Sequence, residues 1–159
     1  MTTQSTSTLP ITPASDDYAY AMHVHASAQA AIAAVSDGEE ICRWWTAVVR
    51  FERHGKELQL FTNDGPMVSF ALDDAPDPGK VTWTVTACMV EDWVGTRPSF
   101  SVLQQDDGTC AIEFRHVGLR PALECFDQCR AGWAHFMPSL RQFLETGVGR
   151  PNEPRDPSA

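Results

Sequence analysis

The sequence lacks the long apolar runs and the clusters of basic residues that membrane proteins and nucleic-acid-binding proteins need. No stretch approaches the roughly 18 apolar residues of a transmembrane helix, and the first seven residues have neither the basic nor the apolar region of a signal peptide. Only 12 lysines and arginines are present beside 21 aspartates and glutamates, for a formal net charge of -9. A surface of this kind does not suit phosphates or anionic lipids. We therefore expect a soluble cytoplasmic protein, with neither nucleic acid nor membrane as a partner.

Motifs that mark a known catalytic chemistry are also missing. The sequence contains no GxSxG nucleophile elbow, no glycine loop that would cradle a phosphate, no HExxH metal-binding helix and no Rossmann fingerprint. We expect no cofactor and no metal ion. Whether the chain is an enzyme stays open on these grounds.

Cysteine is present in an odd number, which does not suit a disulfide framework. The five residues are Cys42, Cys88, Cys110, Cys125 and Cys129. All lie in segments that we predict as helices or strands, so they are expected to be reduced thiols. The last two are four positions apart on one predicted helix and share a face. That spacing would serve two metal ligands or a redox pair, but two small buried apolar side chains are the favoured interpretation.

What is present is the length and composition of one globular domain, with 159 residues of which 43% are hydrophobic. Residues 1–15 are rich in Ser, Thr and Pro, and residues 150–159 contain three prolines. Such compositions are typical of disorder. We therefore predict disordered tails at 1–15 and 150–159 around a single domain at 16–149.

The first ordered segment alternates between two faces. Tyr20, Met22 and Val24 share one face of a predicted strand over residues 18–26, and His23 and His25 share the other. Two histidines at this spacing occur in some metal-binding strands, but their face is the outward one, so a solvated pair is favoured.

Two short helices and six more strands are expected after this first strand. A helix over 28–35 is capped by Ser27, and a second helix over 39–45 follows the break at Asp37-Gly38. Short turns then separate alternating segments, which predicts antiparallel neighbours. These strands cover residues 48–53, 58–62, 67–72, 80–87, 98–105 and 109–117.

A long amphipathic helix is predicted over about 121–147. Apolar residues recur in it at spacings of three and four, Gly147 is placed to cap its C-terminal end, and Pro138 predicts a kink near Ala134. The expected fold class is α+β: a curved seven-stranded antiparallel sheet wrapped around the C-terminal helix, with two short helices after the first strand. Such an arrangement leaves a cavity between sheet and helix.

Short sequence pieces, in order and spacing, carry a resemblance to a known fold family. They are Val24 to Ala28, Arg43 to Thr46, Val81 to Trp83, Trp93 to Thr96, Gly108-Thr109, His116 to Leu119 and Gly132-Trp133. With these pieces, residues 17–151 resemble the SRPBCC superfamily, the START or Bet v 1-like helix-grip fold, and within it the branch called activator of Hsp90 ATPase homologue-like. The resemblance implies a helix-grip fold with a cavity, and it implies no particular reaction.

The branch name suggests a co-chaperone, but the sequence does not favour Hsp90 as a partner. In the eukaryotic activator a separate N-terminal domain supplies much of the grip on Hsp90, whereas only the predicted tail precedes Tyr18 in this chain. We expect the name to be shared through the fold.

Large aromatic side chains are the strongest candidates for a binding site. They fall on predicted inward faces or near the cavity mouth, where they would form rigid walls for an apolar or aromatic ligand. The alternative is that they simply fill the core. The predicted ligand-binding residues are Trp45, Phe70, Trp83, Phe100, Phe114, His116, Cys129, Trp133 and Phe136. Arg97 and Arg120 would meet an anionic group at the mouth, although exposed arginines usually serve solubility.

His116 is the one candidate for a catalytic group in the cavity. Alternation along 109–117 places it on the apolar face with Phe114, where a neutral imidazole would bind a ligand or act as a general base. Glu91 or Asp92 would orient it if neighbouring strands bring them together. The alternatives are a hydrogen-bonded histidine that fixes the turn before the last helix, and two acids that are merely solvated.

Three functions follow as hypotheses. The first is a cofactor-free protein that holds a small hydrophobic or aromatic ligand in the cavity. The second is a polyketide cyclase-like or hydrolase-like enzyme that uses His116, and the third is an interaction module of the Hsp90-activator kind. A homodimer is a further expectation for a cavity protein of this size.

Overall fold

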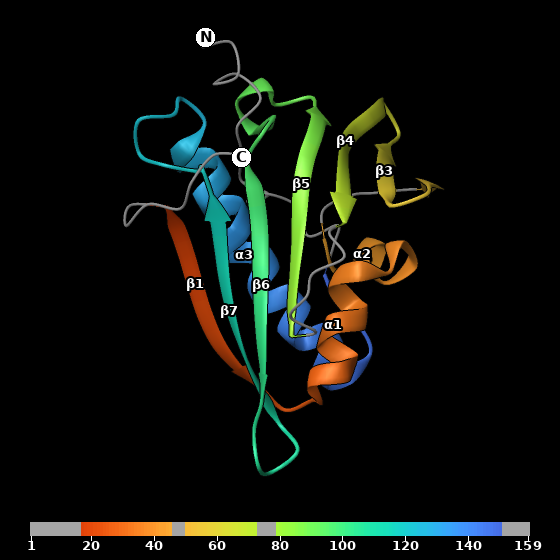
Figure 1. Ribbon diagram of the computed structural model, residues 1–159, viewed down its shortest axis with the longest axis vertical. Helices are drawn as coiled ribbons and strands as arrows, with labels where there is room; N and C mark the ends of the chain where they lie inside the picture. The colour runs from red at the N-terminus through yellow and green to blue at the C-terminus, as the bar shows by residue number, and fades with distance from the viewer. Residues whose placement is uncertain (1–16, 46–49, 73–78, 151–159) are drawn as a thin grey trace, which may run out of the picture.

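The computed structural model describes residues 17–45, 50–72 and 79–150, and these form a helix-grip fold (Figure 1). Within them, seven strands make one antiparallel sheet in the order β1-β7-β6-β5-β4-β3-β2. The expected α+β class, with two short helices after the first strand and a long helix at the end, is confirmed. The elements are β1 (Tyr18–Val24), α1 (Ala28–Ser36), α2 (Gly38–Trp44), β2 (Arg50–His54), β3 (Glu57–Thr62), β4 (Gly65–Leu72), β5 (Lys80–Cys88), the 3-10 helix η2 (Glu91–Trp93), β6 (Arg97–Gln104), β7 (Cys110–Val117) and α3 (Phe126–Thr146).

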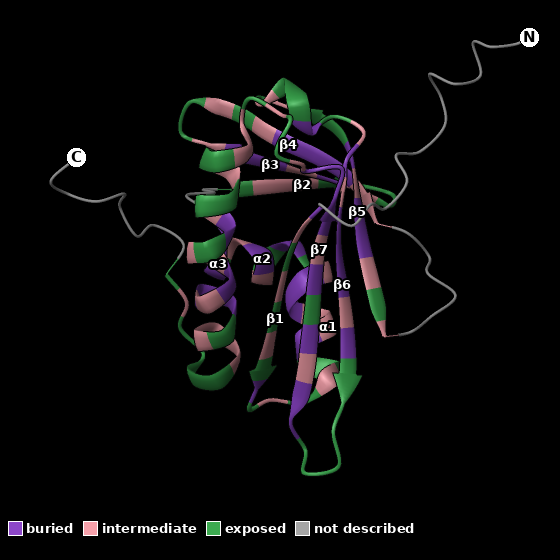
Figure 2. Ribbon diagram, turned by 90° about the vertical axis from the view of Figure 1, so that its left-hand side faces the viewer, coloured by how far each residue is buried: buried purple, intermediate pink, exposed green. Residues whose placement is uncertain are grey.

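The sheet is strongly curved, and α3 packs along its inner face. Figure 2 shows β2, β3 and β4 running across the direction of β1, β7 and β6 at the upper end of the molecule, with α3 alongside the sheet. Helix α1 packs against β5, β6 and α3, while α2 packs against α3 and β2. The buried side chains of all these elements meet in the space between sheet and helix, so the core lies there.

Period-two alternation correctly assigns the faces of the two strands that pair at one end of the sheet. Cys110, Ile112, Phe114 and His116 of β7 are all buried, whereas Glu113 between them is exposed. Strand β1 follows the same rule against β7, with its outward residues exposed.

Strand β1 is shorter than expected, because its last predicted residues leave the ladder. It ends at Val24 rather than at residue 26. The backbone N–H of His25 donates to Glu145 Oε2 (2.9 Å) on α3 instead of to a neighbouring strand. The strand end is thereby tied to the last turn of α3.

The two short helices begin as the sequence predicts. Ser27 accepts a hydrogen bond from the Ala30 N–H (3.1 Å) as the N-cap of α1. Asp37 ends α1 through its own N–H and starts α2 by accepting from the Glu39 N–H (3.0 Å). One residue therefore caps both helices.

The long helix α3 begins at Phe126, five residues later than the sequence predicts. The Leu123 N–H bonds the carbonyl of Arg120 (2.9 Å), and the Phe126 N–H bonds that of Leu123 (3.0 Å), so this segment forms three-residue turns. Apolar residues continue through it at helical spacing, which is why periodicity overextended the helix. The predicted C-terminal cap is confirmed, since Gly147 has φ 88°. Pro138 lies inside α3, and the kink near Ala134 stays a prediction.

An aromatic cluster fills the middle of the core. Trp83 stacks on Phe70 with ring centroids 4.4 Å apart and lies 5.0 Å from Phe100. The indole N–H groups of Trp44 and Trp83 donate to the carbonyls of Ala34 (2.9 Å) and Val35 (2.7 Å) at the end of α1. The polar edges of these buried rings are therefore satisfied, and the central space between sheet and helix is packed.

The predicted disordered tails lie outside the described residues, except for Arg150. The Arg150 N–H donates to Ser139 Oγ (2.7 Å), and this hydroxyl donates to the carbonyl of Trp44 (2.8 Å). The described chain is thus attached to α2 and α3 up to its last residue.

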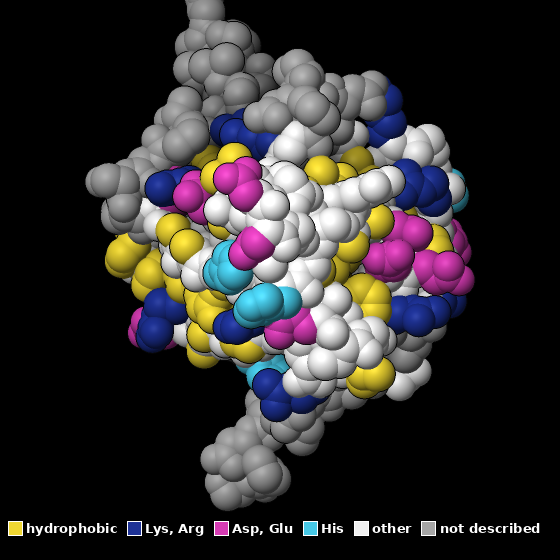
Figure 3. Space-filling model, turned by 90° about the horizontal axis from the view of Figure 1, so that it is seen from below, with side chains coloured by type: hydrophobic (Ala, Val, Ile, Leu, Met, Phe, Trp, Pro, Cys, Tyr) yellow, Lys and Arg dark blue, Asp and Glu magenta, His cyan; other side chains and the backbone are white. Residues whose placement is uncertain are grey.

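The described surface carries both signs of charge. Figure 3 shows Lys, Arg, Asp and Glu side chains interspersed with apolar ones at the lower end of the molecule. Among the described segments, the helices are all too short or too polar to cross a lipid bilayer.

Candidate functional site

A pocket of about 170 Å³ opens at the upper end of the fold, between the first half of β4, the end of β5, η2 and the first half of α3. Its walls are almost entirely apolar, with two thiols as the only other side-chain groups. The lining residues are Trp45, Met67, Val68, Cys88, Met89, Val90, Trp93, Cys129, Gly132, Trp133 and Phe136. A pocket with this lining would take an apolar molecule.

Three tryptophans with nearly parallel rings dominate the pocket. The Trp45 and Trp133 rings are 5.6 Å apart at 7°, and the Trp93 ring lies 5.9 Å from that of Trp133 at 10°. Trp45 and Trp93 complete the triangle at 6.2 Å and 17°. The three rings come from the end of α2, from η2 and from α3, so tertiary folding alone brings them together.

Four of the predicted ligand-binding residues line this pocket: Trp45, Cys129, Trp133 and Phe136. The other aromatics, Phe70, Trp83, Phe100 and Phe114, are at most 1% exposed and belong to the core beneath it. Phe114 supports the pocket from below, since its ring centroid lies 4.4 Å from that of Trp133. Some of the inward aromatics therefore line a pocket, as the first interpretation predicts, and the others pack the core beneath it, as the second predicts.

Trp45, Trp93 and Trp133 together form what we call the tryptophan wall. His116 lies behind it, fully buried, and both of its ring nitrogens are in hydrogen bonds. Trp133 Nε1–H donates to His116 Nδ1 (2.9 Å), so the ring proton belongs on Nε2. Nε2 then donates to Thr96 Oγ1 (2.8 Å), and this hydroxyl donates to the carbonyl of Trp93 (2.6 Å). Burial lowers the pKa of His116 from 6.5 to about 3, although the carboxylate of Asp17 acts in the opposite direction.

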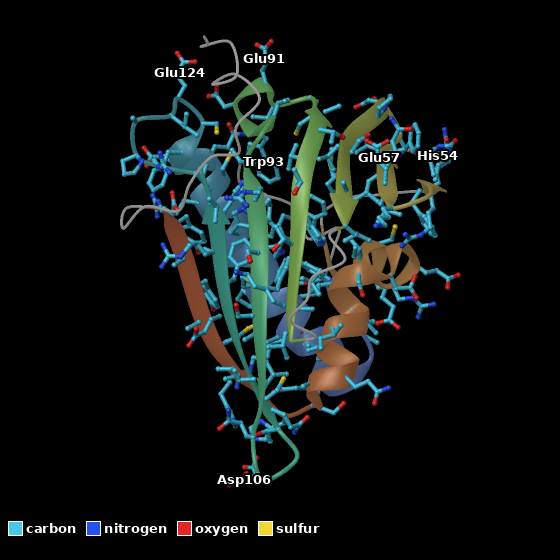
Figure 4. The ribbon with its side chains drawn as sticks, viewed as in Figure 1. His54, Glu57, Glu91, Trp93, Asp106 and Glu124 are labelled. Carbon is cyan, nitrogen blue, oxygen red and sulfur yellow. The ribbon has the colours of Figure 1, made fainter. Side chains whose placement is uncertain are left out.

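This geometry favours a structural histidine over a general base. A base needs a free nitrogen that faces the substrate, and neither nitrogen of His116 is free. Glu91 and Asp92 are exposed on η2, and Figure 4 shows Glu91 pointing away from the fold while Trp93 turns back into it. Neither acid bonds the imidazole, whose nitrogens are taken by Thr96 and Trp133.

Arg120, which the sequence offers for an anionic ligand, instead holds a buried carboxylate. Its Nε donates to Asp17 Oδ1 (2.8 Å), and the Gly118 N–H donates to the same oxygen (3.1 Å). The Asp17 side chain is fully buried. These bonds tie the start of β1 to the loop after β7, next to His116.

Seven pocket residues were not among the predicted ligand-binding residues: Met67, Val68, Cys88, Met89, Val90, Trp93 and Gly132. Met67 and Val68 lie in the first half of β4, Cys88 ends β5, and Met89, Val90 and Trp93 lie in the loop after β5 and in η2. Met89 is 71% exposed, which is unusual for a large apolar side chain.

The histidine pair of the first strand has other partners. The His23 and His25 rings lie 5.2 Å apart, but His23 Nε2 bonds Thr109 Oγ1 (2.7 Å) and His25 Nδ1 bonds Glu145 Oε2 (3.3 Å). Across the described ranges, the structure brings together no group of three or more His, Cys, Asp or Glu residues that would hold a metal.

Comparison with solved structures places the chain in a fold class. Solved structures of other proteins share its helix-grip architecture, which is the fold expected from the sequence pieces. No protein-family model and no curated protein matches the sequence.

Particular solved structures share this architecture at low sequence identity. The Aha1 dimer from Colwellia psychrerythraea matches with a TM-score of 0.69 and 23% identity, over 84% of this chain and 98% of that one. DynU16, from the dynemicin biosynthetic locus, matches with a TM-score of 0.61 and 20% identity, over 89% of this chain and 52% of that one. CalU16 from Micromonospora echinospora matches with a TM-score of 0.55 and 13% identity, over 79% of this chain and 72% of that one. At these identities the likeness is one of fold.

Proposed function

We propose that the protein binds a small planar apolar molecule of one or two aromatic rings in the pocket at the upper end of α3. The observation that carries this proposal is the set of three nearly parallel indole rings, Trp45, Trp93 and Trp133, on the walls of an apolar pocket. Flat aromatic walls favour a flat ligand, because offset stacking adds to the burial of apolar area.

The size of the pocket limits the ligand. An apolar cavity of about 150 Å³ accepts one benzene, so about 170 Å³ suits one ring wholly inside, with a second ring toward the mouth. Met67 and Met89 are among the residues that line both this pocket and a second hollow of about 290 Å³. Methionine adapts readily to different neighbours, so this wall is the one expected to move for a larger ligand.

Gly132 offers a way to fill the pocket without disturbing the core. It lies on the pocket wall in α3, and a Cβ built on it meets nothing within 4 Å. Gly132→Leu should place a side chain in the empty space while improving helix propensity by up to about 1 kcal/mol. Ala131→Leu is the matched control, because Ala131 is the exposed neighbour on the same helix.

The experiment is calorimetric titration of 1-naphthol into wild-type protein and both variants. We expect saturable one-to-one binding to the wild type and to Ala131→Leu, and at least about tenfold weaker binding to Gly132→Leu, or about 1.4 kcal/mol. Cyclohexanol, which is apolar but not planar, should bind more weakly than 1-naphthol. Equal affinity of Gly132→Leu and wild type for 1-naphthol would place any binding elsewhere and refute the proposal.

The enzyme hypothesis has no comparable support, because both nitrogens of His116 are engaged in hydrogen bonds.

The Colwellia protein is described as a dimer, which supports a homodimer as a proposal for this chain. Light scattering tests it, since a mass of 17.6 kDa in solution would contradict it. The expectation that Hsp90 is not a partner and the expected cytoplasmic location stay predictions.

A further inference from the structure

Two thiols meet at the start of α3, beside the pocket. Cys125 is the N-cap residue of α3, and Cys129 follows one helical turn later. The Cys129 side chain is near enough to help raise the pKa of the Cys125 thiol, and the Cys129 N–H bonds the Cys125 carbonyl (2.8 Å). Cys129 also lines the pocket, so its sulfur is reachable from outside.

The surroundings of the two sulfurs differ, and this assigns each a role. Burial, followed by the nearby side chain of Cys129, raises the pKa of Cys125 to about 12. Cys125 does not line the pocket, so an oxidant that enters there meets Cys129 first. The Cys129 sulfur accepts a hydrogen bond from Trp93 Nε1–H (3.1 Å), and Cys129 lines the pocket in the first turn of α3.

We propose that Cys129 and Cys125 form a peroxide-sensitive redox pair, in which Cys129 is the reacting thiol and Cys125 the resolving one. The Cys129 thiolate attacks the distal oxygen of a hydroperoxide, the O–O bond breaks, and an alcohol or water leaves with the proton. The Cys125 sulfur attacks the sulfenic acid so formed, and the proton of the Cys125 thiol passes to the leaving hydroxyl. A disulfide forms and one water leaves, so two thiols are oxidised as one hydroperoxide is reduced.

The backbone allows this bond with a small local movement. Residues four apart in a helix have Cα atoms about 6 Å apart, within the range of disulfides, but their Cβ atoms must approach by roughly 1 to 2 Å. Cys125 stands outside the regular helix and follows three-residue turns at Leu123 and Phe126. The movement therefore strains one terminal hydrogen bond and leaves the rest of α3 intact.

Oxidation has a consequence for the pocket wall. When Cys129 Sγ turns toward Cys125, it leaves the indole N–H of Trp93, which then lacks its acceptor. Trp93 is part of the tryptophan wall, so its fluorescence should report the oxidation state. The redox pair does not depend on ligand binding in the pocket, so the experiments can refute one of these proposals and leave the other standing.

The experiment treats the full chain with tert-butyl hydroperoxide and follows it by intact and peptide mass spectrometry. Wild-type protein should lose two hydrogen atoms and yield a Cys125–Cys129 disulfide that dithiothreitol reverses. Cys125→Ser should instead accumulate a sulfenic acid at Cys129, trapped by dimedone at least about tenfold faster than at Cys42. Cys129→Ser should give neither product, and Cys42→Ser should behave as the wild type.

Three results would overturn the proposal. A Cys88–Cys129 disulfide in the wild type would remove Cys125 as the resolving thiol, and this outcome is a real competitor because Cys88 and Cys129 line the same pocket. Sulfinic acid at Cys129 of the wild type without a disulfide would mean that Cys125 does not reach it. Dimedone labelling of Cys42 as fast as that of Cys129 would remove the special reactivity.

Discussion

Replacing His116 should change how the free energy of unfolding depends on pH. Its pKa is about 3 in the folded protein, because the ring is buried, and 6.5 is its ordinary value. Between these values the unfolded chain binds a proton that the folded protein does not, so stability falls as the pH falls. The whole difference is on the order of 4 to 5 kcal/mol, and about 2 kcal/mol of it should be lost between pH 7 and pH 5.

The assay is urea unfolding at pH 7, 6 and 5, followed by far-ultraviolet circular dichroism. In this range the carboxylates of Asp107 and Glu145 stay ionised, because hydrogen bonds from Thr109 and from the His25 N–H lower their pKa values. With a denaturant slope of about 2 kcal/mol per molar urea, the midpoint of the wild type should fall by about 1 M from pH 7 to pH 5.

His116→Gln isolates the effect, because an amide can accept from Trp133 and donate to Thr96 but does not titrate. Its urea midpoint should fall much less between pH 7 and pH 5 than that of the wild type. His54→Gln is the control, since the His54 side chain is 65% exposed on β2, and it should keep the wild-type pH dependence. If the midpoint of His116→Gln falls as far as that of the wild type, the assignment of a neutral, buried His116 is wrong.

Two further predictions concern packing. Trp133→Phe leaves His116 Nδ1 buried without its donor and opens a space in the core, which should cost about 2 to 4 kcal/mol in urea unfolding; a loss below about 1 kcal/mol would contradict the hydrogen bond. Gly149→Ala brings a Cβ within 2.6 Å of the carbonyl oxygen of Arg43, so it should lower stability by about 1 to 3 kcal/mol. Gly132→Ala, whose Cβ meets nothing within 4 Å, is its control and should be neutral or stabilising.

The fold could be predicted from the sequence because its strands obey local rules. Cys110, Ile112, Phe114 and His116 alternate with more exposed residues, and this pattern alone puts them on one inner face. The start of α3 could not be predicted in this way. The three-residue turns at Leu123 repeat almost as often as the turns of an α-helix. The spacing of apolar residues therefore does not distinguish such turns from an α-helix.

The pocket could be predicted only in part. The alternation of apolar residues shows which side chains face inward, but it does not show which of them lie deep in the core and which line a pocket. Phe114 and Trp133 both face inward and are 1% and 2% exposed, yet only Trp133 also lines the pocket. The difference arises from where η2 places Trp93, where β4 begins and where β5 ends, and these positions are set by tertiary folding. The role of His116 likewise depended on Trp133, a donor 17 positions away on another element.

The pairing of β1 with β7 has a consequence for the order of folding. The first strand of the sheet finds its neighbour in the last one, with Val24 opposite Cys110 and Tyr18 opposite His116. During synthesis β1 must therefore wait, unpaired, until the chain from residue 24 to residue 110 has emerged and its hairpins have formed. Contacts so distant in sequence slow folding, so β1 is expected to dock late, and a chain released before β7 would expose β1 as a free edge for aggregation.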